Sequence, residues 1–183
     1  QWLEETSAAT GDHFIAIPHN SNISKGFMFP LETLRGERFT PEYLQLRRTW
    51  EPVVEATQTK GDSETYPTLA PADAFADFER YTFYIQATPA PYQPGAGDFV
   101  RSALQRGLRI GQEYGINPYQ FGLIGSTDSH TGLSSPQENN FQGQEPKDSI
   151  PANKAQPMSD AGSPAGWDFS ASGMSAVWAQ DNT

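Results

Sequence analysis

The chain has 183 residues, enough for a domain with a hydrophobic core, and a formal net charge of −10. Its 12 basic residues are scattered, so nucleic acid is not expected as a partner, because such binding needs a basic surface. The absence of cysteine excludes disulfides and thiolate zinc sites. No apolar run approaches the ~20 residues that cross a bilayer, so no membrane partner is expected either.

Both ends of the sequence interrupt regular elements. The first residues, from Gln1 to Glu5, have helical composition without an initiator Met. The last, Asp181-Asn182-Thr183, read as the start of a helix that does not follow. We therefore expect the chain to be a fragment of a longer protein.

Composition and periodicity predict helices that alternate with short strands. Helices are expected at residues 3–10, 41–50, 71–80 and 98–114, and strands at residues 13–18, 52–58, 121–126 and 172–179. Thr40 should cap the second helix, and Gly115 should end the last. The core face of that last helix is expected to hold Val100, Ala103, Leu104, Gly107, Leu108 and Gly111. Residues 131–168 have almost no apolar periodicity, which predicts a lid-like or mobile insertion.

The alternation is typical of an α/β fold whose parallel strands are buried on both faces. In such folds the chemistry lies on loops at the carboxyl ends of the strands. Polar clusters follow three of the four predicted strands, and this agreement predicts an enzyme.

The pair Asp128-x-His130, directly after the third strand, is the strongest chemical signal. A carboxylate and an imidazole separated by one residue can face the same point, and together they suit a divalent metal ion. Taken alone, such a pair is more often a capping aspartate beside a surface histidine. His19 has the same position after the first strand, where a histidine bonded to backbone is the alternative.

Glu55 lies inside an otherwise apolar strand, where an ionised carboxylate is costly unless it is paired or binds a metal. A buried salt bridge explains Glu55 equally well on its own. Because three strands each offer a ligand type, we interpret His19, Glu55, Asp128 and His130 as a metal site. His13, at the opposite end of its strand, is expected to be structural.

The loop Lys60-Gly61-Asp62-Ser63-Glu64 follows the strand that carries Glu55. Lys60 could meet an anionic substrate, and Asp62 or Glu64 could be a further ligand or a base; a solvated turn explains the loop equally well. The sequence has no P-loop, no dinucleotide-binding glycine motif and no nucleophile elbow. Nucleotide-binding proteins and serine hydrolases are therefore disfavoured.

Longer strings resemble one family through nearly the whole chain. They lie at residues 17–22 (IPHNSN), 54–64 (VEATQTKGDSE), 121–133 (FGLIGSTDSHTGL), 166–173 (GWDFSASG) and 176–179 (AVWA). Together they resemble a large bacterial family of domains of unknown function allied to the PHP (polymerase and histidinol phosphatase) metallohydrolases.

The resemblance implies a distorted seven-stranded β/α barrel that hydrolyses phosphoesters with a metal-activated water. It implies two or three divalent metal ions (zinc, manganese or iron), a small-molecule ester as substrate, and metal ligands at His19, Glu55, Asp128 and His130. Glu55, Asp128 and Lys60 are the expected catalytic residues. Asn20, Lys60 and Glu64 are expected to bind substrate.

The family's opening His-x-His strand is absent, so residues 1–183 should be the C-terminal portion of such a domain, an incomplete barrel that needs the N-terminal part of the same protein as its partner. Alone, the chain is expected to bind metal weakly and to be nearly inactive. Two alternatives stay open: a sulfate- or phosphonate-ester hydrolase with the same site, and a non-catalytic binding module that keeps the fold.

Overall fold

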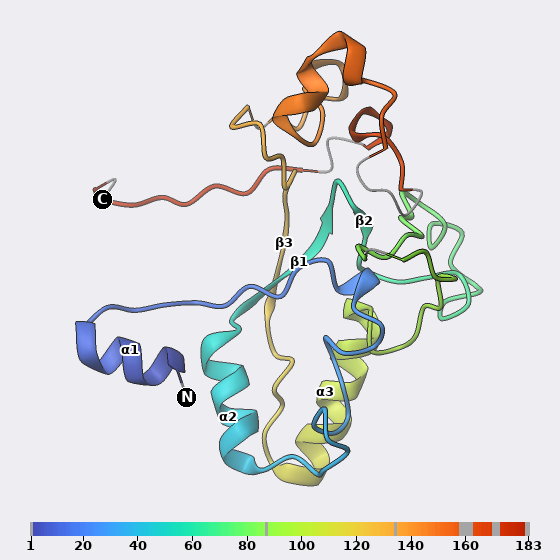
Figure 1. Cartoon of the computed structure of the whole chain (residues 1–183). Coiled ribbons are helices and arrows are strands. Elements are labelled where there is room, and N and C mark those ends of the chain that lie inside the picture. The colour runs from blue at the N-terminus through green and yellow to red at the C-terminus, as the bar shows by residue number, and fades with distance from the viewer. Residues whose placement is uncertain (1, 87, 134, 158–162, 170–172, 182–183) are drawn as a thin grey trace. The chain divides into compact units, whose positions relative to one another are not determined.

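The computed structural model describes residues 2–86, 88–133, 135–157, 163–169 and 173–181. This part of the chain has a mixed α/β fold with a small, open, three-stranded sheet, and it shows no closed barrel (Figure 1). The helices are α1 (Trp2–Thr10), α2 (Pro41–Trp50) and α3 (Val100–Tyr114), and the strands are β1 (Val53–Gln58), β2 (Gly61–Asp62) and β3 (Gly122–Gly125). Short 3-10 turns lie at η1 (Ser21–Ile23), η2 (Glu138–Asn140), η3 (Pro146–Ser149), η4 (Pro151–Asn153) and η5 (Gly166–Asp168).

The sheet has the order β2-β1-β3 and combines both strand directions. β1 and β2 are antiparallel, with Thr57 opposite Asp62. The amide of Gly122 donates to the carbonyl of Pro52 over 2.9 Å, and that of Ser126 to Thr57 over 3.1 Å. Residue numbers therefore increase in the same direction along β1 and β3, so the two strands are parallel. The parallel arrangement predicted from sequence holds for this pair alone among the described strands.

The described chain divides into two compact units. The first unit comprises residues 1–56, 63–77 and 93–123, and the second comprises residues 57–62, 78–92 and 124–183. The first unit holds a core of buried apolar side chains: Phe29, Phe39, Leu44, Val54, Val100, Ala103, Ile110, Tyr119 and Phe121. Removing these side chains from water is the main force that stabilises this unit.

Helices α2 and α3 form where their capping signals predict. The hydroxyl of Thr40 accepts from the amide of Tyr43, which satisfies one of the free N–H groups at the start of α2. Gly115 ends α3 in the left-handed region, with φ of 76°. The buried face of α3 consists of Val100, Ala103, Gly107 and Ile110. The prediction that Leu104 and Leu108 belong to this face is wrong, since they are 39% and 70% exposed.

The predicted strand at residues 13–18 is not found, although the segment runs beside the start of β1. Two backbone bonds hold it there: Ala16 N donates to Trp50 O, and Glu55 N donates to Pro18 O. Pro18 and Pro52 both lack an N–H group, so a regular ladder cannot continue between the two segments. Ile15 and Ile17 are exposed, so the segment is not a buried strand.

Two further predicted elements are absent from the described residues. Residues 71–80 form turns instead of a helix. The side chain of Asp73 accepts from the amide of Phe75 and from Arg101, and such local bonds compete with helix formation. Residues 173–179 form no strand, and Trp178 is 97% exposed; residue 172 of that prediction lies outside the described residues. No helix in the described chain has the length and apolar character needed to span a membrane.

Candidate functional site

Two loops that follow neighbouring strands bring predicted site residues together in the second unit. Lys60 lies in the turn between β1 and β2, and Asp128 follows β3 by three residues. The ammonium group of Lys60 donates to Oδ2 of Asp128, and the two form an ion pair. Only 5% of Lys60 is exposed, so the carboxylate offsets much of the cost of burying its charge.

The buried side chain of Gln144 holds the backbone of Asp128. Its Nε2 donates to the carbonyl oxygen of Asp128 over 2.6 Å, and its Oε1 accepts from the hydroxyl of Thr59. Asp128 has φ of 48°, a left-handed conformation that is uncommon for residues other than glycine. The hydrogen bonds of Gln144 stabilise this conformation and connect the turn after β3 to the turn after β1.

His130 lies between two carboxylates. Its Nε2 is 3.4 Å from Oδ1 of Asp128, and its Nδ1 is 3.1 Å from Oε1 of Glu145. The amide of His130 donates to the carbonyl of Gln144 over 2.9 Å. The ring is half-exposed and can therefore meet a ligand from solvent while Glu145 orients it.

The position of Glu145 is fixed by a fully buried carboxylate, that of Asp148. The amide of Glu145 donates to Oδ2 of Asp148 over 2.7 Å, at the start of η3. Trp167 Nε1 donates to the carbonyl of Asp148 over 2.5 Å. These bonds anchor the segment that supplies Glu145 to His130.

Asp128 is held in its ionised form. Burial alone raises the pKa of its carboxyl, but the hydrogen bond and charge of Lys60, with the charge of His130, outweigh burial and lower the pKa below its usual range. Asp128 therefore carries a negative charge at neutral pH and can accept hydrogen bonds or bind a cation.

A cavity of about 270 Å³ opens against Asp128. It is lined by the turn after β3, Ser126 to Ser129, and by Met174 and Ser175. A small ligand in this cavity would contact Asp128, the residue that Lys60 and His130 flank.

His19 and Glu55, the other predicted metal ligands, belong to the first unit. Nδ1 of His19 is 3.1 Å from the carbonyl oxygen of Ile17. Since a carbonyl only accepts, Nδ1 is the donor in this contact. The side chain of Glu55 is buried, and its amide bonds to the carbonyl of Pro18, one residue before His19.

The two predicted substrate-binding residues of the first unit differ in their surroundings. Asn20 has φ of 53°, and its buried Oδ1 has no hydrogen-bond partner in the described part of the chain. Glu64 accepts from Nη2 of Arg101 over 2.6 Å, and Arg101 also pairs with Asp73. Glu64 is thus engaged by the protein's own arginine on the surface.

The predicted metal ligands fit a metal centre in part. Asp128 and His130 lie together in the second unit, whereas His19 and Glu55 belong to the first. Among the described residues, no group of three or more His, Asp or Glu side chains is arranged to hold a metal ion. The ammonium of Lys60 already neutralises the Asp128 oxygen that a cation would approach.

Gln144, Glu145 and Asp148 are the residues that sequence reasoning missed. All three lie in the segment predicted only as an insertion. A signal was present, because an acidic residue before Pro146 and another three positions later form the capping pattern of a helical turn. That pattern predicts η3, but not its contact with His130.

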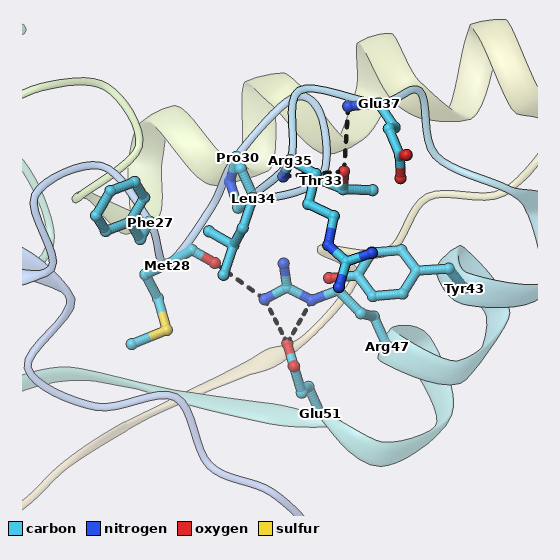
Figure 2. A pocket seen from close by; sticks show the side chains of 10 residues that line it. All are labelled: Phe27, Met28, Pro30, Thr33, Leu34, Arg35, Glu37, Tyr43, Arg47 and Glu51. Atoms are coloured by element: carbon cyan, nitrogen blue, oxygen red, sulfur yellow. Dashed lines mark hydrogen bonds and ion pairs between the residues drawn. The ribbon is translucent and has the colours of Figure 1, made fainter. Parts of the chain in front are cut away.

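A second cavity, of about 520 Å³, lies in the first unit between residues 27–37 and α2 (Figure 2). Its buried Arg47 donates through Nε and Nη2 to Oε2 of Glu51, over 2.9 and 2.7 Å, and through Nη2 to the carbonyl of Met28. None of the predicted site residues lines this cavity. Because Arg47 is fully engaged with Glu51 and the backbone, we assign it a structural role that anchors α2 to the loop.

Comparison with known protein families finds a match for this chain, and the description of that family names no activity. The family described as "Protein of unknown function (DUF3604)" matches residues 1–183, the whole chain. No curated protein and no solved structure matches the chain. The chain therefore belongs to the DUF3604 family of proteins of unknown function.

Proposed function

We propose that this chain supplies one part of the active site of a metal-dependent phosphoesterase. The observation that carries the proposal is the group formed by Lys60, Asp128, His130 and Glu145 at the carboxyl ends of two parallel strands. Open α/β sheets bind their ligands at this edge. A cation, an ionised carboxylate and an oriented imidazole are the groups that phosphoryl transfer needs.

Each side chain of the group has a distinct role in the proposal. Asp128 is ionised and faces a cavity of about 270 Å³ that admits a small ester. Without ligand, Lys60 neutralises the carboxylate of Asp128. When a metal cation takes the place of Lys60 at that carboxylate, the ammonium of Lys60 binds a phosphoryl oxygen. Glu145 holds the His130 ring so that Nε2 points toward Asp128.

The metal ligands of the proposal are Asp128, His130, His19 and Glu55. Bound divalent ions would activate a water molecule and polarise the phosphoryl group. The hydrogen bond from Nδ1 of His19 to a backbone carbonyl supports this role, because ligating histidines usually donate their other N–H in this way. The same type of support comes from Glu145, whose Oε1 lies 3.1 Å from Nδ1 of His130.

The proposal includes a PHP-like β/α barrel completed by the N-terminal remainder of the same protein. β3 has a neighbour on one side only among the described strands, and its Leu123 is 55% exposed. An unpaired edge with exposed apolar side chains is suited to pairing with a further strand. The predicted lid, residues 131–168, contributes Glu145 and borders the same site.

The test is hydrolysis of nitrophenyl phosphate, bis(nitrophenyl) phosphate and nitrophenyl sulfate in the presence of Mn²⁺ or Zn²⁺. The chain is assayed alone and together with the rest of its protein. Asp128→Asn and His130→Gln should each lower kcat about a hundredfold or more, whereas His13→Gln, a matched histidine far along the chain from the site, should not. Undiminished activity in Asp128→Asn would contradict the proposal, and turnover of the sulfate alone would replace it with a sulfatase.

A further inference from the structure

A small aromatic cavity lies in the second unit, directly beside the loop that carries Lys60. Its volume is about 170 Å³, and Thr59 and Gly61, the two neighbours of Lys60, both line it. Tyr81, Phe83 and Phe169 supply its aromatic lining, and Pro164, Glu79, Arg80 and Asp168 also line it. Pockets that bind drug-sized ligands measure roughly 300–1,000 Å³, so this cavity has room for a single ring and not for a larger molecule.

The three rings are arranged around Tyr81. Its centroid is 5.6 Å from that of Phe169, with 30° between the planes, and 5.4 Å from that of Phe83, with 64° between them. Tyr81 and Phe169 are buried, at 7% and 6% exposed, so packing fixes their orientation. Phe83 is 37% exposed, so this part of the cavity lining can be reached from solvent. Aromatic rings prefer such tilted and stacked neighbours.

Gly61 is needed for this arrangement. Its φ is 97°, and a Cβ atom at this position would lie 2.6 Å from both Cβ and N of Tyr81. No side chain fits there, so glycine lets Tyr81 pack directly against the loop of Lys60. The glycine thus links the aromatic cavity to the site loop.

A second link joins the cavity to Asp128. Thr59, which lines the cavity, donates from its hydroxyl to Oε1 of Gln144, and Nε2 of Gln144 donates to the carbonyl of Asp128. Thr59 in the cavity lining is therefore connected through Gln144 to the backbone of Asp128.

We propose that this cavity binds the aromatic ring of an aryl ester whose anionic group is held by the ammonium of Lys60. The inference rests on the proposed hydrolase function and names its substrate class. Ring binding discriminates against alkyl esters, because an alkyl group leaves the faces of Tyr81, Phe83 and Phe169 without a stacking partner.

The ring site is tested without turnover by titrating the protein with nitrophenol and following the aromatic signals of Tyr81, Phe83 and Phe169 by NMR. Phe83→Ala should weaken binding about tenfold, because Phe83 is the exposed wall of the cavity. Phe75→Ala is the matched control, since Phe75 is 81% exposed and outside the cavity; it should leave the affinity unchanged. Equal affinity in Phe83→Ala and wild type overturns the inference.

A kinetic measurement separates this inference from the function on which it rests. Phe83→Ala should lower kcat/KM for phenyl phosphate about tenfold and leave kcat/KM for methyl phosphate unchanged. If both esters are hydrolysed and Phe83→Ala affects them equally, the aromatic site is wrong while the hydrolase stands. If neither ester is hydrolysed but Phe83→Ala weakens nitrophenol binding, the hydrolase is wrong and the aromatic site stands.

Discussion

Nε2 of Gln144 donates a hydrogen bond of 2.6 Å to the backbone carbonyl of Asp128, from a side chain that is fully buried. The same amide accepts from Thr59, so one glutamine connects the turns that follow β1 and β3. Asp128 keeps its left-handed backbone, with φ of 48°, under this constraint. The geometry of the candidate site thus depends on a residue with no expected chemical role.

Replacing Gln144 should therefore destabilise the site. Gln144→Leu leaves the Asp128 carbonyl and the Thr59 hydroxyl without this partner, at a cost of about 1–3 kcal/mol in the free energy of unfolding. Urea denaturation measures the change. Gln137→Leu is the control, because Gln137 is exposed, and it should have little effect. Equal stability of the two variants would mean that Gln144 does not support the turn.

Lys60 should control the titration of Asp128. In Lys60→Met the hydrogen bond and the positive charge are lost, so the pKa of Asp128 should rise. Because the folded-state pKa is lowered in the wild type, ionised Asp128 stabilises the fold above the unfolded value of about 3.9. This contribution is lost as the pH falls through the folded pKa. The carboxyl ¹³C signal of Asp128 reports the shift; Lys147→Met should not change it, and an unchanged titration in Lys60→Met would contradict the role of Lys60.

Breaking the buried ion pair of the first unit should lower the free energy of unfolding more than breaking an exposed ion pair. Arg47 and Glu51 have side chains 9% and 20% exposed, whereas Arg38 and Glu113 are 79% and 46% exposed. Arg47→Met leaves Glu51 largely buried without its partner and should cost about 2 kcal/mol or more. Arg38→Met should change the unfolding free energy very little. Thermal unfolding of both variants checks the ranking, and the reverse order would refute it.

Two glycines with positive φ should respond differently to alanine. Gly61→Ala combines a left-handed backbone with a collision against Tyr81, and should cost about 2 kcal/mol or more. Gly115 has φ of 76°, but a Cβ atom added there would meet no other atom within 4 Å, so Gly115→Ala should cost only the strain of about 1 kcal/mol. Near-UV circular dichroism should show a changed tyrosine signal for Gly61→Ala alone. Matching losses in the two variants would mean that Tyr81 moves aside freely.

Metal binding should be detectable without any substrate. Added Mn²⁺, which is paramagnetic, should broaden the NMR signals of Asp128 and His130 before those of His13. Asp128→Asn should abolish this selective broadening, because a neutral amide is a weak ligand for a hard cation. Broadening that is the same for His13 and His130 would indicate nonspecific binding.

Local signals predicted much of the secondary structure. The caps at Thr40 and Gly115 locate α2 and α3, because capping depends on residues a few positions apart. Composition likewise predicts α1, and the apolar run before Lys60 predicts β1. The prediction of a strand at residues 13–18 was wrong because proline interrupts the ladder between this segment and its neighbour. Which segment pairs with which is a property of the fold, and it cannot be read from either segment alone.

The candidate site was predicted only in part, for a related reason. Asp128 and His130 are two positions apart, and their proximity follows from spacing. Lys60 and Asp128 are 68 positions apart, and their ion pair depends on the pairing of β1 with β3. Glu145 and Gln144 lie in a segment without periodicity, where their long-range contacts leave no mark in the local pattern.

The division of the chain into two units has a consequence for its synthesis. Residues 57–62 and 78–92 belong with residues 124–183, yet they are flanked by segments of the other unit. A ribosome releases both of these segments before any of their later partners exists. Tyr81 and Phe83 therefore stay exposed to solvent until Phe169 has been translated. During this interval the nascent chain is open to binding by chaperones and to self-association.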